Sequence, residues 1–281
     1  MSHTPGTGEM RAAMRQAVQR SKGQKAKAED AKTQWKEAGK QRRKVRSLLA
    51  LAVVGPLSLL CLLYPLHSMG YLRLFSPAAL SKAMANPQAT ESLDLTHQYL
   101  ETVPEGIDSL KNLTNLTLDQ NRIQELPDSL FKLSKMRHLS VQYNALKTVP
   151  PTIGELSSLE SLDLAGNHLG ELPEQLFKLP RLETLVLSDN NLTRLPEDLG
   201  KLSSLKILEI KKNDLSTLPQ SVSRLSNLEV LNLVGNKLTS LPDLSGLKNL
   251  KSLALQNTGL SQAEVQKIRA QLSGRNVVIT I

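Results

Sequence analysis

The sequence is poor in the residues that disulfide-bonded, metal-binding or aromatic-rich proteins rely on. A single cysteine excludes an internal disulfide and a thiolate metal cluster. The five histidines are scattered, without the spacing of metal ligands. Aromatic residues make up only 3%, so aliphatic side chains have to fill any core. The sequence also lacks phosphate-binding loops, nucleophile elbows and catalytic-triad patterns, and it therefore predicts no enzyme activity, no cofactor and no metal site.

All of the excess positive charge lies in an N-terminal tail. Residues 1–46 contain 13 Lys and Arg against 4 Asp and Glu, whereas residues 47–281 contain 22 of each, so the net charge of +9 belongs to the tail. The tail has too few large apolar residues to form a core, and we expect it to be disordered or a solvated helix. No recognition motif accompanies the charge, so no nucleic-acid partner is expected.

Residues 47–72 form an apolar segment without Asp, Glu, Lys or Arg. Twenty residues of helix rise about 30 Å, the thickness of a bilayer's hydrocarbon core. We therefore predict a single transmembrane signal anchor here. A buried core helix is one alternative, although soluble helices of this length usually carry a polar face. A cleaved signal peptide is another, but its candidate site at Ala83-Met84-Ala85 lies well beyond the apolar run.

The charges beside the apolar segment predict its orientation. Arg42, Arg43, Lys44 and Arg46 precede it, and few basic residues follow closely. The positive-inside rule then places the tail in the cytoplasm and residues 73–281 on the periplasmic or lumenal side. The tail is also suited to contact anionic lipid headgroups.

Residues 90–260 repeat with a period of 23. We count eight units and number positions from the first residue of each. The units begin at Thr90, Leu113, Met136, Leu159, Leu182, Leu205, Leu228 and Leu250. Prolines recur at the same spacing at Pro104, Pro127, Pro150, Pro173, Pro196, Pro219 and Pro242. Asparagines recur at the ninth position at Asn121, Asn144, Asn167, Asn190, Asn213 and Asn236.

The repeat has the form L-x-x-L-x-L-x-x-N-x-L-x-x-L-P, followed by x-x-L-x-x-L as in residues 195–202. This pattern resembles the leucine-rich repeat family and is similar to its Ras-group intracellular and bacterial members. The resemblance implies an α/β solenoid. Its concave face would be a parallel sheet, and its convex face would consist of irregular or short helical turns.

The residues support this arrangement independently. Leu162 and Leu164 are two apart and point the same way from a short strand, while Asp163 points outward. An asparagine at the ninth position can satisfy backbone groups where the chain turns inward, because its amide both donates and accepts. We therefore interpret these asparagines as structural.

Both ends of the repeat array carry segments suited to close it. Residues 73–89 are predicted to be a linker and N-terminal cap with a short helix. Residues 261–281 are predicted to be a C-terminal cap, with a capping box from Ser261 to Glu264, a helix and a final strand.

The outward positions of the strands form the one extended surface whose side chains are not required by the core or the turns of the repeat. They suit a protein partner better than a small molecule, which prefers a closed pocket. Clustered β-branched residues with nearby charges indicate where a partner binds, although such residues also simply suit strands. The predicted binding residues are Asp119, Asp163, Val186, Ile207, Glu209, Lys211, Val230 and Val234. An alternative surface is the ridge formed by His97, Tyr99, Arg122, Tyr143 and His168.

Two functions remain open from the sequence. The first is a membrane-anchored, non-enzymatic module that binds a protein through its concave face. The second is a cytosol-facing scaffold or regulator of a signalling enzyme, as the similarity to Ras-group repeats implies. The second requires the opposite topology.

Overall fold

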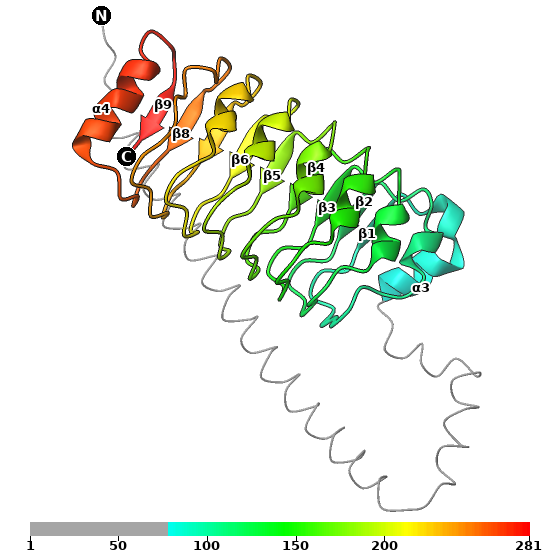
Figure 1. The fold of residues 1–281 in the computed structure, drawn as a ribbon. Helices are drawn as coiled ribbons and strands as arrows, with labels where there is room; N and C mark the ends of the chain where they lie inside the picture. The colour runs from blue at the N-terminus through cyan, green and yellow to red at the C-terminus, as the bar shows by residue number, and fades with distance from the viewer. Residues whose placement is uncertain (1–77) are drawn as a thin grey trace, which may run out of the picture. The chain divides into compact units, whose positions relative to one another are not determined.

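The computed structural model describes residues 78–281, which contain one parallel sheet of nine strands in chain order (Figure 1). Eight strands come from the eight repeats, and the ninth follows the last helix. The strands are β1 (Ser92–Asp94), β2 (Asn115–Thr117), β3 (His138–Ser140), β4 (Ser161–Asp163), β5 (Thr184–Val186), β6 (Ile207–Glu209), β7 (Val230–Asn232), β8 (Ser252–Ala254) and β9 (Val278–Thr280).

Neighbouring strands pair without any shift in repeat position. Leu162 of β4 lies opposite Leu139 of β3 and Leu185 of β5. A given position of the repeat therefore forms a continuous column across the sheet. The predicted parallel sheet is confirmed, and its register follows from the constant length of the units.

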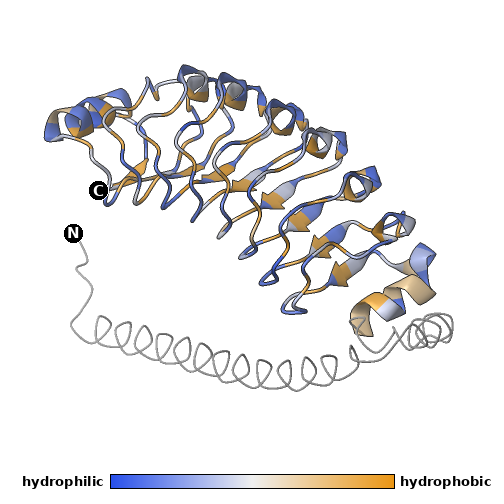
Figure 2. Cartoon of the chain, turned by 60° about the horizontal axis from the view of Figure 1, so that its bottom comes forward, coloured by the Kyte–Doolittle hydropathy of each residue, from blue (hydrophilic) through white to orange (hydrophobic). Residues whose placement is uncertain are grey.

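Short 3₁₀ helices follow the prolines on the convex side, and Figure 2 shows them along the outer side of the arc, opposite the strands. In the second unit, Leu130 donates to the carbonyl of Pro127 at 3.0 Å, and Leu133 donates to Leu130 at 3.3 Å. Proline suits the position before the turn because no donor is needed from it there. The turns are η3 (Ile107–Ser109), η4 (Asp128–Lys132), η5 (Pro151–Glu155), η6 (Glu174–Lys178), η7 (Glu197–Lys201) and η8 (Gln220–Arg224).

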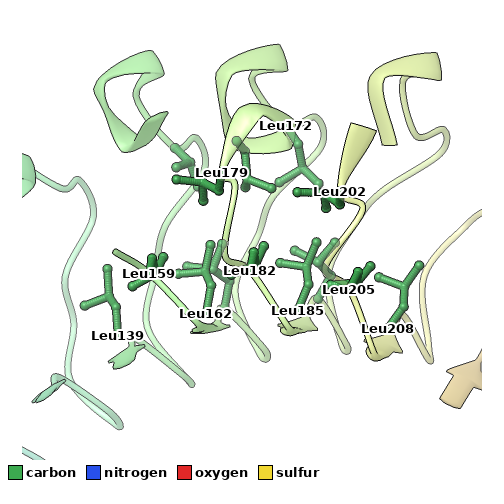
Figure 3. Close-up of a cluster of buried hydrophobic side chains, with 14 of the residues drawn as sticks. Leu139, Leu159, Leu162, Leu172, Leu179, Leu182, Leu185, Leu202, Leu205 and Leu208 are labelled. Atoms are coloured by element: carbon green, nitrogen blue, oxygen red, sulfur yellow. The ribbon is translucent and has the colours of Figure 1, made fainter. Parts of the chain in front are cut away.

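The core is built almost entirely of leucine. Figure 3 shows leucines from strands and turns stacked between the two faces, with Leu162 and Leu185 from strands below Leu179 and Leu202 from the turns. Most of these side chains are fully buried. Burial of a leucine contributes roughly 1.5–3 kcal/mol, so the repeated core is the main stabilising term.

Each end of the solenoid is covered by a helix. Helix α3 (Ala78–Ala85), followed by the 3₁₀ turn η2 (Pro87–Ala89), buries Leu80 and Ala83 against the first repeat. At the other end, helix α4 (Gln262–Gln271) buries Ile268.

Helix α4 begins with a side-chain cap. Oγ of Ser261 accepts a hydrogen bond from the backbone of Glu264 at 3.3 Å, which is half of the predicted capping box. The Glu264 carboxylate contacts Lys267 at 3.4 Å instead of closing the box.

The seventh unit is one residue shorter than the others and has no 3₁₀ helix between β7 and β8. A local turn replaces it, in which Asp243 accepts hydrogen bonds from the backbone and the hydroxyl of Ser245 at 2.9 and 2.6 Å. Aspartate commonly forms this turn with the residue two positions on. The deletion is thus absorbed on the convex side, and the strand register is unchanged.

Within residues 78–281, no helix combines the length and apolar character required to cross a membrane. The predicted tail (1–46) and the predicted transmembrane segment (47–72) lie outside the described residues.

Candidate protein-binding surface

The concave face consists of three columns of outward side chains, at the third, fifth and seventh positions of each unit. Because successive side chains alternate across a strand, these columns face away from the leucine core. The third column holds Ser92, Asn115, His138, Ser161, Thr184, Ile207, Val230, Ser252 and, from β9, Val278. The fifth holds Asp94, Thr117, Ser140, Asp163, Val186, Glu209, Asn232 and Ala254, and the seventh holds Thr96, Asp119, Gln142, Ala165, Ser188, Lys211, Val234 and Gln256.

The structure brings three of the four predicted apolar residues together. Ile207 and Val230 are direct partners in the β6–β7 register, and Val186 lies diagonally from Ile207 on β5. All three are partly exposed. Val234 is four residues beyond Val230 on the same side, with Asn232 between them, so it stands apart from this cluster.

Asp119 is held by two hydrogen bonds within the face. Its Oδ1 accepts from the hydroxyl of Ser140 at 2.6 Å and from the backbone of Gln142 at 2.8 Å. Asp119 is a predicted binding residue, and these bonds also give it a structural role between neighbouring repeats.

Asp163 is the carboxylate most affected by its surroundings. Burial raises its pKa to about 6, and the negative charges of Asp119 and Glu209 act in the same direction. A hydrogen bond from the backbone of Ala165 to its Oδ1, at 3.0 Å, and the charge of Lys211 oppose this effect. The raised pKa means that the carboxylate is insufficiently compensated by the groups around it.

Glu209 and Lys211 are predicted binding residues on the same strand. Their side chains form an ion pair with an Nζ–Oε2 distance of 3.5 Å, and both are more than 30% exposed. Such a pair contributes little to stability, about 0–1 kcal/mol, and can be exchanged for contacts with a partner.

Two side chains of the seventh column carry a polar atom that is buried and has no partner. Among residues 78–281, Oγ of Ser188 and Oε1 of Gln256 are the buried side-chain oxygens without a hydrogen bond. Neither residue is among the predicted binding residues. The repeat pattern predicts that both side chains point outward from the sheet. It does not predict that they are buried, because burial depends on the size of the neighbouring side chains.

The ninth-position asparagines do not belong to the surface. Asn167 is 3% exposed, and its Nδ2 donates to the carbonyls of Val141 and Leu164 at 2.9 and 3.0 Å. Equivalent bonds from Nδ2 to the preceding repeat are made by Asn144, Asn190, Asn213 and Asn236. We call this series of ninth-position asparagines the asparagine ladder. Their predicted structural role is confirmed.

The alternative ridge follows the turns at the carboxyl ends of the strands. Residues at the eighth position adopt positive φ, among them Tyr143 with φ 52° and Gly166 with φ 67°. The ring of Tyr143 lies against Gly166 and is 53% exposed. Arg122 stands over the ring of Tyr99, 5.8 Å from its centroid, so this ridge is partly stabilised by its own contacts.

No group of three or more His, Cys, Asp or Glu side chains in the described part of the chain is arranged to hold a metal ion. The carboxylates of the concave face are distributed along columns instead of converging on one point. The arrangement suits contacts with an extended or folded polypeptide.

Comparison with known proteins agrees with this architecture. The leucine-rich repeat family model matches residues 111–169, 157–215 and 203–260. The chain therefore belongs to the leucine-rich repeat family. No curated protein sequence matches it.

Solved structures with the same fold come from bacteria and plants. A leucine-rich repeat protein of Leptospira interrogans is 31% identical with a TM-score of 0.61, and the match covers 71% of this chain but only 56% of that protein. Internalin C2 of Listeria monocytogenes is 28% identical, with a TM-score of 0.59 and coverage of 68% and 80%. A plant peptide hormone receptor, solved in complex with RGF2, is 25% identical, with a TM-score of 0.51 and coverage of 60% and 32%.

Proposed function

We propose that this protein is a non-enzymatic module that binds a protein partner through the concave face of its repeats. The observation that carries the proposal is the partly exposed apolar cluster of Val186, Ile207 and Val230, next to the charged side chains of Glu209 and Lys211. Burying such a cluster supplies the apolar centre of an interface, and the surrounding charges supply its polar rim.

The similarity to the plant receptor supports this proposal at the level of the fold. That receptor was solved in complex with RGF2. A long strand face is also a better match to a polypeptide than to a small ligand, since eight strands at about 4.8 Å span roughly 34 Å.

We further propose that residues 47–72 anchor the module in a membrane, with the basic tail in the cytoplasm and the repeats on the periplasmic or lumenal side. This part rests on the uncharged length of that segment and on the basic cluster before it. Tethering would raise the local concentration of the repeats near partners at the same membrane.

The binding proposal is tested by changing the apolar cluster. A photo-crosslinking amino acid at Thr184, beside the cluster, captures the partner from the native membrane. In the double variant Ile207→Asp with Val230→Asp, we expect crosslinked partner to fall at least tenfold while the far-UV circular dichroism spectrum is retained.

The matched control adds the same charges elsewhere. Thr148 and Thr193 are exposed and lie outside the three columns, so Thr148→Asp with Thr193→Asp should leave capture unchanged. Equal capture by both folded double variants would place the binding site away from the cluster, and the ridge with Tyr143 would then be tested.

A further inference from the structure

The negative charge of the repeat domain is concentrated on its concave face. Residues 78–281 contain 21 Lys and Arg against 22 Asp and Glu, which is close to balance. The three columns, however, hold one cation, Lys211, against four carboxylates. These carboxylates are Asp94, Asp119, Asp163 and Glu209.

Seven of the eight ion pairs among the described residues lie outside the three columns. Three of these ion pairs join the second positions of neighbouring units, just before the strands, at 2.7 or 2.8 Å. They are Arg137–Glu160, Lys206–Glu183 and Lys251–Glu229. On the face, the single ion pair among the described residues is Glu209–Lys211, which is longer at 3.5 Å. Within the described residues, Asp94, Asp119 and Asp163 of the face therefore have no ion-pair partner.

The face also contains two buried side-chain oxygens without a hydrogen bond among the described residues. Ser188 lies two residues past β5, the strand that pairs with the one carrying Asp163, and Gln256 is farther along the same column. A buried polar atom without a hydrogen bond is unfavourable, and such atoms are usually paired in native proteins. The charge imbalance and these two oxygens both favour a polar ligand that carries positive charge, since the Ser188 hydroxyl can donate or accept and the Gln256 oxygen accepts.

Building on the proposed function, we propose that the partner docks as an extended polypeptide segment that combines a basic and an aliphatic side chain. The Lys or Arg side chain would be bound by the carboxylate of Asp163, and the negative charges of Asp119 and Glu209 on either side would strengthen its attraction. The aliphatic side chain would pack on Ile207 and Val230.

The spacing of the columns sets the spacing of these two side chains. Asp163 lies on β4 and the apolar pair on β6 and β7, two to three strands away. At about 4.8 Å per strand this is roughly 10–14 Å, which an extended chain covers in about three to four residues. The segment would cross the strands along the length of the solenoid, with its basic residue three or four positions from its aliphatic residue.

Peptide selection against the full-length protein tests this inference. A displayed library of random 12-residue peptides is selected on the immobilised chain, and enriched sequences are synthesised for fluorescence anisotropy. We expect enrichment of Lys or Arg three or four positions from Ile, Leu or Val. Peptides of the same composition with these residues adjacent should bind more weakly.

Two variants measure the contribution of each contact. Asp163→Asn keeps the oxygen that accepts from Ala165 and removes only the charge, so we expect about tenfold weaker binding of the selected peptides. Glu174→Gln is the matched control, because Glu174 is an exposed carboxylate in the turn η6 on the convex side. It should leave the affinity unchanged.

The outcomes separate this inference from the proposed function. Enriched peptides that lack basic residues, yet lose binding to Ile207→Asp with Val230→Asp, would overturn the basic-segment inference and leave the concave face as the binding site. Selected peptides that bind Asp163→Asn and the double variant as tightly as the unaltered protein would overturn both.

Discussion

The backbone N–H of Leu146 donates to Oδ1 of Asn167 in the following repeat, at 3.0 Å. The other end of the same side chain donates to Val141 and Leu164, so one buried amide links two turns of the solenoid. Replacing Asn167 with alanine leaves these backbone groups without partners. We expect Asn167→Ala to lower the free energy of unfolding by about 1–3 kcal/mol, measured by urea denaturation.

Asn191, which follows the ladder residue Asn190 in the next unit, provides the control. Asn191 is exposed, so Asn191→Ala should change the free energy of unfolding by less than about 0.5 kcal/mol. An unchanged denaturation midpoint for Asn167→Ala would contradict the structural role of the ladder.

Gly166 tests the positive-φ position of the repeat. It has φ 67°, and a Cβ atom there would collide with the ring of Tyr143. We expect Gly166→Ala to destabilise the domain by about 1–2 kcal/mol, from backbone strain and displacement of the ring. Gly170 has open space around it and no positive φ, so Gly170→Ala should leave the free energy of unfolding nearly unchanged. Urea denaturation measures both variants.

Combining Gly166→Ala with Tyr143→Ala separates the two causes. If the ring contributes, the double variant loses less stability than the sum of the two single changes. Strict additivity would assign the whole effect of Gly166→Ala to the backbone.

The raised pKa of Asp163 predicts a gain in stability on acidification. Burial raises the pKa to about 6 in the folded state, above the value of about 3.9 in unfolded chains. The folded protein therefore binds the proton first, and this residue's contribution to stability rises as the pH falls from 7 through 6 towards 4. The gain is about 1–2 kcal/mol after allowance for partial exposure.

Asp163→Asn isolates this contribution in urea denaturation at about pH 7 and pH 4.5. Other carboxylates act in the opposite direction; for example, hydrogen bonds from the backbone of Ser221 and Gln220 lower the pKa of Glu197. These effects are common to both proteins and cancel in the difference. If the stability of both proteins had the same pH dependence, the pKa of Asp163 would not be raised by folding, and the prediction would be wrong.

The topology of the proposed anchor is open to a direct test. Epitope tags are placed at both termini, and sealed membranes are treated with protease before and after permeabilisation. We expect the C-terminal tag to be protected until the non-cytoplasmic side is opened. Cleavage of that tag from the cytosolic side would reverse the orientation and favour the scaffold hypothesis, with signalling enzymes as the partners to test.

The sequence predicts the fold well because each structural requirement recurs in every unit. The spacing of Leu162 and Leu164 identifies the strand, and Asn167 identifies the inward turn, so the strand positions and register follow directly. The missing 3₁₀ helix of the seventh unit was not predicted. A one-residue deletion is visible in the sequence, but the turn formed by Asp243 and Ser245 is a local solution.

The binding surface is less predictable, because it depends on contacts between side chains of different repeats. Alternation correctly places Ile207 and Val230 on the concave face, yet it does not reveal that Val234 stands apart or that Asp119 is bonded to Ser140. The burial of Ser188 likewise depends on its neighbours across the sheet.

The asparagine ladder also makes the length of the domain an adjustable quantity. Each ladder bond joins a turn only to its immediate neighbour, as between Asn167 and Leu146. A tandem duplication of one unit would leave every other bond in place and extend the strand face by about 4.8 Å. The length of this face is thus set by the number of units and not by the identity of any single residue.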